Sequence, residues 1–481
     1  MNKSNYLGGY VAMDLISIVS GLLPYVKYSI FIIIILIIGY LIYRKFYQGK
    51  YPIRLSKFVF ITLLICWFIV VFGITTLSRG ANYTEQINLS LFTSYVNAWN
   101  KWSLTEFQLI IFNMLMFVPL GALLPLIHHK NKSFWRVLVI SITFTSCIEI
   151  SQLITGKGIF ELDDLLHNTI GSLAGYFIVM VFILWTEQRK LTFIPIVKAI
   201  SIPLVFITLF GVAKVVYNAQ EFGNLPFKPA QKQNMEHIQI QLETELSNKS
   251  PNACVYYNKD VNDIKKGRLI SQSIAKQFNL KQQGGIRIEV DNRIFTFQDD
   301  EGSTYYLTYF MSNGSWSLSF DNINDAPLKV DIKQQKQLLE TWLKNEGLLP
   351  NNAIYQQQDE RTIRWDLAEP ENLQSTCEDF SKGVVMISLF NQQVPDILFD
   401  ISDNEMVAKK QLISQEQAYN VLVTGEFSTY NPLQKGDRLT ITDVRLTYTY
   451  DTKGYYQPVY VFTCIVNDSD YIIEVLISAI Q

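Results

Sequence analysis

The chain divides into two parts with different patterns of hydrophobic and polar residues. Up to about residue 217, long apolar runs alternate with short polar stretches, whereas short alternating and amphipathic runs follow from about residue 218. A helix needs about 20 mostly apolar residues to cross the roughly 30 Å hydrocarbon core of a bilayer. Six runs reach that length and predict an α-helical multi-pass membrane bundle. The predicted spans are Tyr28–Phe46, Lys57–Ser78, Phe107–Ile127, Phe134–Ile154, Leu166–Trp185 and Ile194–Tyr217.

The segment before the first span is apolar but interrupted. Tyr10–Val26 contains Asp14, Gly21 and Pro24. It could be a seventh span, but a helix that lies in the interface or re-enters it fits these interruptions better. We therefore expect an interfacial or re-entrant segment over residues 1–27, followed by a transmembrane domain over residues 28–217.

Lysine and arginine are unequally distributed among the loops. They concentrate in the first, third and fifth loops, at Arg44, Lys45, Lys50, Arg54, Lys57, Lys130, Lys132, Arg136, Arg189 and Lys190. Basic loops stay in the cytoplasm. With six spans, the N-terminus and residues 218–481 are then extracytoplasmic, and a seventh span would move only the N-terminus inside.

Residues 218–481 predict an α+β domain of helix-plus-antiparallel-hairpin units. Amphipathic helices are expected at Val261–Leu280, Ile332–Glu346 and Gln415–Val423, each followed by strand-like segments. The expected strands are Ile286–Phe297, Thr304–Phe320, Thr362–Leu367, Val384–Leu389, Ile397–Ile401, Arg438–Tyr450, Gln457–Val466 and Tyr471–Ile477. This order suggests three repeat-like units.

Charge and cysteine content narrow the alternatives. The net charge of −2 argues against nucleic acid as a partner, because the chain has no basic stripe to bind the phosphate backbone. In an extracytoplasmic domain, Cys254, Cys377 and Cys464 permit one disulfide and leave one thiol over. The spacing does not select a pair, and Cys254–Cys377 is one candidate.

Polar side chains inside the predicted spans gather at one depth, near the outer leaflet. They come from four spans or their ends and are Arg79, Asn113, Glu149, Gln152, Lys157, Asp163, Asp164 and Asn168. Polar groups in a membrane are costly, so such a cluster indicates either a ligand-binding site or a set of contacts between helices.

Three segments within this region resemble the VanZ-like family. They are N-M-L-M-F-V-P-L-G from Asn113, I-E-I-S-Q-L from Ile148, and G-K-G-I-F-E-L-D-D-L-L-H-N-T-I-G-S-L-A-G-Y from Gly156. The resemblance covers most of residues 55–185 and departs at Lys157, where arginine is common. It implies a cell-envelope role connected with resistance to glycopeptides, chiefly teicoplanin, without supplying a reaction, ligand or cofactor. The order of elements in the tail faintly resembles PepSY-type modules.

Each acidic residue of the cluster has two interpretations. Asp163 and Asp164 could bind a cation or an amine, or one of them could cap the fifth span. Glu149 could bind a ligand or carry a proton, or it could pair with Arg79 or Lys157. By helical phase, His167 is expected to face away from Asp164.

The sequence leaves three functional hypotheses. The first is a non-enzymatic envelope protein whose outer-leaflet pocket binds a glycopeptide, a lipid headgroup or a cell-wall precursor. The second is an intramembrane enzyme or proton-coupled transporter using Glu149, Asp163 and Asp164. The third is a membrane-anchored sensor that binds an envelope protein through residues 218–481. No catalytic motif, metal site or cofactor site is recognised.

Overall fold

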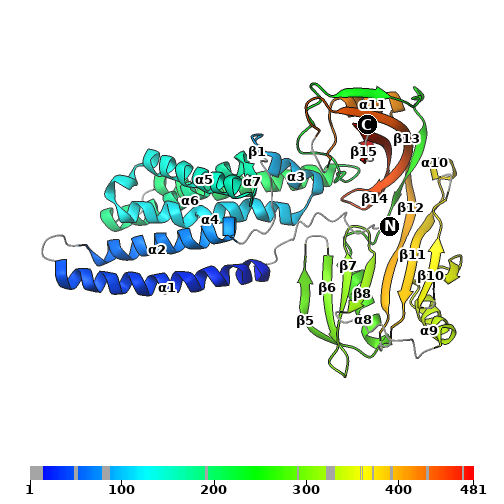
Figure 1. Cartoon of the computed structure of the whole chain (residues 1–481), viewed down its shortest axis with the longest axis horizontal. Helices are drawn as coiled ribbons and strands as arrows, with labels where there is room; N and C mark the ends of the chain where they lie inside the picture. Colours follow the sequence, from blue (N-terminus) through cyan, green and yellow to red (C-terminus); the bar gives the residue numbers. More distant parts are fainter. Residues whose placement is uncertain are drawn as a thin grey trace. The chain divides into compact units, whose positions relative to one another are not determined.

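The computed structural model describes residues 15–47, 53–77, 87–189, 193–289, 292–320, 331–357, 359, 361–370, 373–390, 394–429, 433–467 and 471–480. The chain forms a helical unit and a strand-rich unit, with the main division between Gln220 and Glu221 (Figure 1).

The helical unit contains the predicted membrane spans. Within the described residues, six helices are long and apolar enough to cross a bilayer, which confirms the predicted multi-pass bundle. They are α1 (Leu15–Tyr47), α2 (Leu55–Phe72, extended by the π-helical turn Gly73–Leu77), α4 (Leu104–Ile127), α5 (Phe134–Thr155), α6 (Leu162–Gln188) and α7 (Phe193–Ala219). The short elements are α3 (Thr93–Lys101), a 3-10 turn at His129–Lys132, and the parallel strands β1 (Ile87–Asn88) and β2 (Phe160–Glu161).

The first helix differs from the sequence prediction. Helix α1 begins at Leu15 and continues through Pro24 into the first span as one helix of 33 residues. Residues 15–27 are therefore continuous with the helix of the first predicted span, whose membrane-length apolar part is Leu23–Phe46. The remainder of the predicted N-terminal segment, residues 1–14, lies outside the described residues.

Glycines allow α4 and α6 to approach closely. A Cβ atom on Gly171 would lie 1.9 Å from the backbone oxygen of Met114, and one on Gly175 would lie 2.0 Å from that of Val118. From the other helix, a Cβ on Gly121 would lie 1.7 Å from the backbone oxygen of Ser172. Such small-residue contacts replace the hydrophobic effect as the basis of helix association in lipid. They set the spacing of the two helices that carry Asn113 and Asp164.

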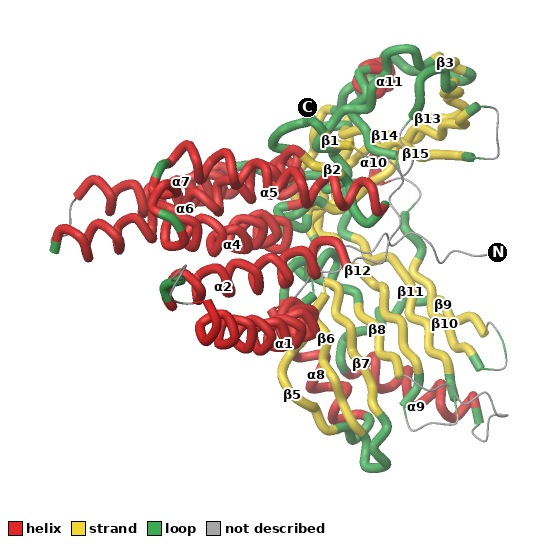
Figure 2. The backbone as a smooth tube through the Cα atoms, turned by 60° about the vertical axis from the view of Figure 1, so that its left-hand side comes forward, coloured by secondary structure: helices red, strands yellow, loops and turns green. Residues whose placement is uncertain are grey.

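The strand-rich unit is an α+β domain, as predicted (Figure 2). Its helices are α8 (Ile264–Gln277), α9 (Ile332–Asn345), α10 (Leu373–Thr376) and α11 (Gln415–Val423). Its strands are β3 (Gln239–Leu242), β4 (Asn252–Tyr257), β5 (Lys281–Ile288), β6 (Asn292–Gln298), β7 (Thr304–Phe310), β8 (Trp316–Phe320), β9 (Ile354–Gln357), β10 (Thr362–Leu367), β11 (Phe380–Ser388), β12 (Asp396–Gln411), β13 (Arg438–Tyr450), β14 (Tyr455–Val466) and β15 (Ile472–Ser478).

The long strand β12 joins the two parts of this domain. Near its beginning it pairs with β8 and β11, and near its end it pairs with β4, always antiparallel. Helices α8 and α9 pack on one apolar core that includes Trp316 and Trp365, and α11 packs on a second that includes Phe462. The sequence predicted the three longer helices, but it predicted β12 only as the short segment Ile397–Ile401.

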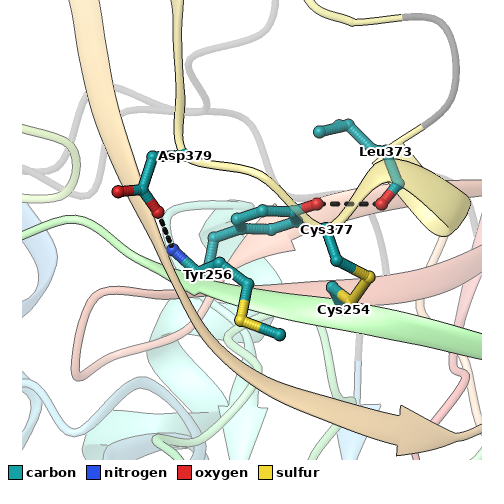
Figure 3. Close-up of a disulfide and its surroundings, with 6 residues drawn as sticks. Cys254, Tyr256, Leu373, Cys377 and Asp379 are labelled. Carbon is teal, nitrogen blue, oxygen red and sulfur yellow. Dashed lines mark hydrogen bonds between the residues drawn. A yellow bond between two sulfur atoms is a disulfide. The ribbon is translucent and has the colours of Figure 1, made fainter.

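A disulfide fixes the segment that follows α10. Cys254 on β4 is bonded to Cys377, with their Cα atoms 5.6 Å apart, so the candidate pairing is confirmed (Figure 3). Beside it, the Tyr256 hydroxyl donates to the backbone oxygen of Leu373 at 2.8 Å. Cys464 is a free, fully buried thiol.

Candidate functional site

Helices α4 and α6 bring three polar side chains together at the end of the bundle where α5 ends and α6 begins, which we call the α5–α6 end. The Asn113 amide on α4 donates a hydrogen bond of 2.6 Å to Oδ1 of Asp164 on α6. Nδ1 of His167 lies 3.9 Å from the same carboxylate oxygen. His167 is 1% exposed, and its ring meets the Tyr95 ring edge-on at 5.2 Å.

The neighbouring acid, Asp163, accepts hydrogen bonds from a different part of the chain. Its carboxylate is fully buried and accepts hydrogen bonds from the backbone N–H groups of Phe92 and Ser94, at 2.6 and 2.8 Å. The Thr93 hydroxyl donates a third, at 3.0 Å. These donors lie where α3 begins, so Asp163 caps α3 from another part of the chain. The geometry thus favours a capping role, for α3 and not for the fifth span, which is α6.

Helices α5 and α6 carry a ladder of facing polar residues. The Ser141 and Ser172 hydroxyls are 2.6 Å apart, and the Asn168 amide donates to the Thr145 hydroxyl at 2.8 Å. The helices are antiparallel, and the second pair lies four residues further along α5 and four residues earlier along α6 than the first. One more step of four residues in each helix places Glu149 of α5 level with Asp164 of α6. This ladder extends from the interior of the bundle to the α5–α6 end.

The last turn of the ladder is buried as well. Glu149 and Gln152 are each 1% exposed. Oε2 of Glu149 accepts a hydrogen bond of 3.5 Å from the backbone N–H of Glu161, which belongs to β2. The turn after α5 is closed by the Lys157 backbone N–H, which donates to the Gln152 backbone oxygen at 3.0 Å.

Several buried polar atoms near this end have no hydrogen-bond partner in the described protein. They are Oε1 of Gln152, Oδ1 of Asn168 and both ring nitrogens of His167. Buried polar groups in proteins are almost always satisfied by protein, water or ligand. Four atoms of this kind therefore lie near the α5–α6 end.

The structure brings most of the sequence-predicted site residues to this end. Asn113 and Asp164 are in contact, while Glu149, Gln152 and Asn168 line the α5–α6 interface. The half-buried Lys157 forms no ion pair with Glu149 among the described residues. The remaining predicted residue, Arg79, lies outside the described residues.

Sequence reasoning missed His167. It was expected to face away from Asp164, but its ring nitrogen lies 3.9 Å from that carboxylate. The signal was available, because residues at positions i and i+3 are neighbours on a helix surface. Ser141, Thr145 and Ser172 were also missed, since single hydroxyls inside an apolar span are common.

The arrangement suits hydrogen bonding to a polar ligand better than metal binding. In the part of the chain that the structure describes, no group of three or more His, Cys, Asp or Glu residues is placed to hold a metal ion. Carboxylates, carboxamides and an imidazole can instead hold a hydrogen-bonded ligand or exchange a proton with one.

Comparison with known proteins finds a family that is similar to the membrane part. Residues 58–184 match a family model described as VanZ/LLP1, which confirms the resemblance that the sequence motifs predicted. All cluster residues in α4, α5 and α6 fall inside this match. Among curated proteins, none matches the chain.

Two solved structures are similar to the chain at low identity. An uncharacterized protein from Eubacterium rectale ATCC 33656 is 12% identical, covers 51% of this chain and 90% of its own, and has a TM-score of 0.21. The C-terminal domain of YpeB from Bacillus megaterium is 13% identical, with coverage of 44% and 92% and a TM-score of 0.19. TM-scores this low carry no inference about this chain.

Proposed function

On the premise that its membrane part is VanZ-like, we propose that this chain is a cell-envelope membrane protein that contributes to glycopeptide resistance of the teicoplanin type. In this proposal the polar cluster at the α5–α6 end binds a polar group of the antibiotic, of a lipid or of a cell-wall precursor. The observation that carries it is the set of buried, unsatisfied atoms on Gln152, His167 and Asn168. A set of purely structural contacts would satisfy these atoms within the protein.

In this proposal the α5–α6 end lies at the outer leaflet. Two observations support this sidedness. The loops that join the helices at the opposite end carry most of the basic residues, as cytoplasmic loops do. The Cys254–Cys377 disulfide suits a strand-rich unit in an oxidising, extracytoplasmic compartment.

Expression in a susceptible bacterium tests the proposal. The wild-type chain should raise the teicoplanin inhibitory concentration, and Asp164→Ala should lose this effect while still reaching the membrane. Glu187→Gln is the matched control, because Glu187 is a half-exposed carboxylate near the other end of the same helix, paired with Lys132. Unchanged susceptibility on expression of the wild type would remove the resistance function.

A second candidate function is proton-coupled transport or intramembrane catalysis. It is favoured by the level placement of Glu149 and Asp164 and by the imidazole of His167 beside the latter. Proton uptake or turnover of a lipid or cell-wall substrate by the purified protein, abolished in Glu149→Gln, would support it. Their absence in the wild type would exclude it.

A further inference from the structure

A disulfide-linked segment of the strand-rich unit covers a cluster of aromatic side chains. This segment, residues 373–379, consists of the short helix α10 and the three residues that connect it to β11, and we call it the strap. Leu373 of the strap belongs to one buried cluster with Tyr256 of β4 and with Tyr448 and Tyr456 of the β13–β14 hairpin. Tyr256 is fully buried, so solvent does not reach its ring while the strap is in place.

The strap is attached to the sheet at both ends and near its middle (Figure 3). At one end, the Tyr256 hydroxyl donates to the backbone oxygen of the first residue of α10 at 2.8 Å. At the other end, the Asp379 carboxylate accepts a hydrogen bond of 2.7 Å from the backbone N–H of Met406 on β12. Between these two contacts, Cys377 is bonded to Cys254. The covalent attachment of the strap therefore depends on the oxidation state of two cysteines.

The backbone of the strap favours opening once that bond is cut. Cys377 has a φ of 51°, in the left-handed region that residues with a Cβ atom rarely adopt. A reduced Cys377 is free to leave this conformation. Two hydrogen bonds and the buried side chain of Leu373 would then have to keep all seven residues of the strap ordered. The backbone freedom that these residues regain outweighs those contacts.

We propose that residues 373–379 are a redox-controlled strap, closed over the aromatic cluster in the disulfide form and opened when a dithiol reduces the Cys254–Cys377 bond. This inference goes beyond the proposed function and does not depend on it, because the strap and the polar cluster of the membrane helices share no residue. Its consequence is the controlled exposure of an aromatic surface on the strand-rich unit.

The reduction is an ordinary thiol–disulfide exchange. One thiolate of the dithiol attacks the sulfur of Cys377, which is half-buried, whereas Cys254 is fully buried. A mixed disulfide forms, and Cys254 leaves as a thiolate that takes up a proton. The second thiolate of the dithiol then attacks its own first sulfur and displaces Cys377, which is protonated in turn. Two electrons pass to the two cysteines, and the dithiol becomes a disulfide.

Hydroxyl-radical labelling of the purified full-length protein, read by mass spectrometry, tests the strap, because it oxidises tyrosines that solvent can reach. Three samples are compared: the oxidised wild type, the wild type reduced with dithiothreitol that is then removed without oxygen, and Cys377→Ala. We expect Tyr256 to be protected in the first sample and oxidised several-fold faster in the other two. Tyr460, which is buried in the second core of the same unit, should stay protected in all three.

Cys464→Ala is the matched control, because it also removes a cysteine from this unit but leaves the disulfide intact. We expect this variant to keep Tyr256 protected when oxidised and to expose it after reduction, as the wild type does. Reoxidation of the reduced wild type should restore the protection. Maleimide labelling after reduction should modify Cys377 but not the fully buried Cys464.

Continued protection of Tyr256 in both the reduced wild type and Cys377→Ala would overturn the inference, because the strap would then stay closed without the disulfide. Exposure of Tyr460 together with Tyr256 would also overturn it, since reduction would then unfold the unit as a whole. Protection that does not return on reoxidation would rule out a reversible switch.

Discussion

The Asn113 side-chain amide donates a hydrogen bond of 2.6 Å to the Asp164 carboxylate. This contact joins α4 to α6 at the end of the bundle where buried polar atoms collect. It also orients a carboxylate toward His167. In the proposed ligand site, Asp164 is therefore the central residue and Asn113 is the residue that positions it.

Asp163 should be needed for stability, since it caps α3. Asp163→Asn places an N–H donor opposite the donors of Phe92 and Ser94, and we expect a loss of about 1–3 kcal/mol. Thr93→Val removes only one of the three donors and should cost less. Thermal unfolding of the purified protein and proteolysis within α3 measure both effects. A wild-type unfolding midpoint in Asp163→Asn would contradict the capping role.

The close packing of α4 and α6 predicts a strong effect of one added methyl group. Gly171→Ala drives a Cβ to within 1.9 Å of the Met114 backbone oxygen, so the helices must separate, at a cost of about 1–3 kcal/mol. Gly39→Ala on α1 is the matched control, because nothing lies within 4 Å of its Cβ position. Unfolding midpoints in detergent compare the two variants. Equal midpoints would show that the contact between α4 and α6 does not limit stability.

The disulfide should contribute substantially to the stability of the strand-rich unit. Cys254 and Cys377 are separated by 123 residues, and closing a loop of that size stabilises the folded state by about 4–5 kcal/mol in the chain-entropy model. Cys377→Ser should lower the unfolding midpoint of this unit, and a reducing agent should bring the wild type to the same value. A wild-type midpoint that does not respond to reductant would refute this contribution.

Asp299 predicts a pH-dependent stability in the turn between β6 and β7. Burial opposes ionisation of Asp299, but hydrogen bonds from the Tyr305 hydroxyl and from the backbone N–H groups of Ser303 and Glu301 outweigh it and hold its pKa below the ordinary value. The stabilisation is therefore complete well above the unfolded pKa of about 3.9 and is lost as the pH falls through the lower folded pKa.

Asp299→Asn should accordingly destabilise the protein at neutral pH, and its difference from the wild type should shrink in acid. Asp300→Asn is the control, because the contacts of Asp300 with Lys281 and with the Asn279 amide are both exposed to solvent. Denaturant unfolding at several pH values measures the difference. A difference that stays constant between neutral and strongly acidic pH would contradict the assigned hydrogen bonds.

The sequence predicted the membrane helices because the length of an apolar run is a local property. The span expected at Phe134–Ile154 is α5, Phe134–Thr155, and the span expected at Ile194–Tyr217 is α7, Phe193–Ala219. In the tail, the helix at Gln415–Val423 was predicted with its observed bounds. Amphipathic periodicity is a local signal as well.

The contacts that define the site could not be predicted in this way. Asp163 meets the start of α3 across about seventy positions of sequence, and nothing near either segment signals this approach. The dual pairing of β12 likewise depends on strands that are distant in the chain. The polar residues could be grouped by depth, but the ladder that continues inward to Ser141 and Ser172 required the register of two packed helices.

Exchanging the two residues of the Asn113–Asp164 pair tests the proposed role of Asp164 most directly. The double variant Asn113→Asp, Asp164→Asn keeps one amide and one carboxylate in contact but moves the carboxylate from α6 to α4, away from its place beside His167. The measurement is the teicoplanin inhibitory concentration at matched membrane abundance. We expect the double variant to reach the membrane at the wild-type level, because one amide and one carboxylate stay in contact, but to confer no resistance. Full resistance in the exchanged variant would contradict the ligand site, because the pair would then serve only to hold the helices together.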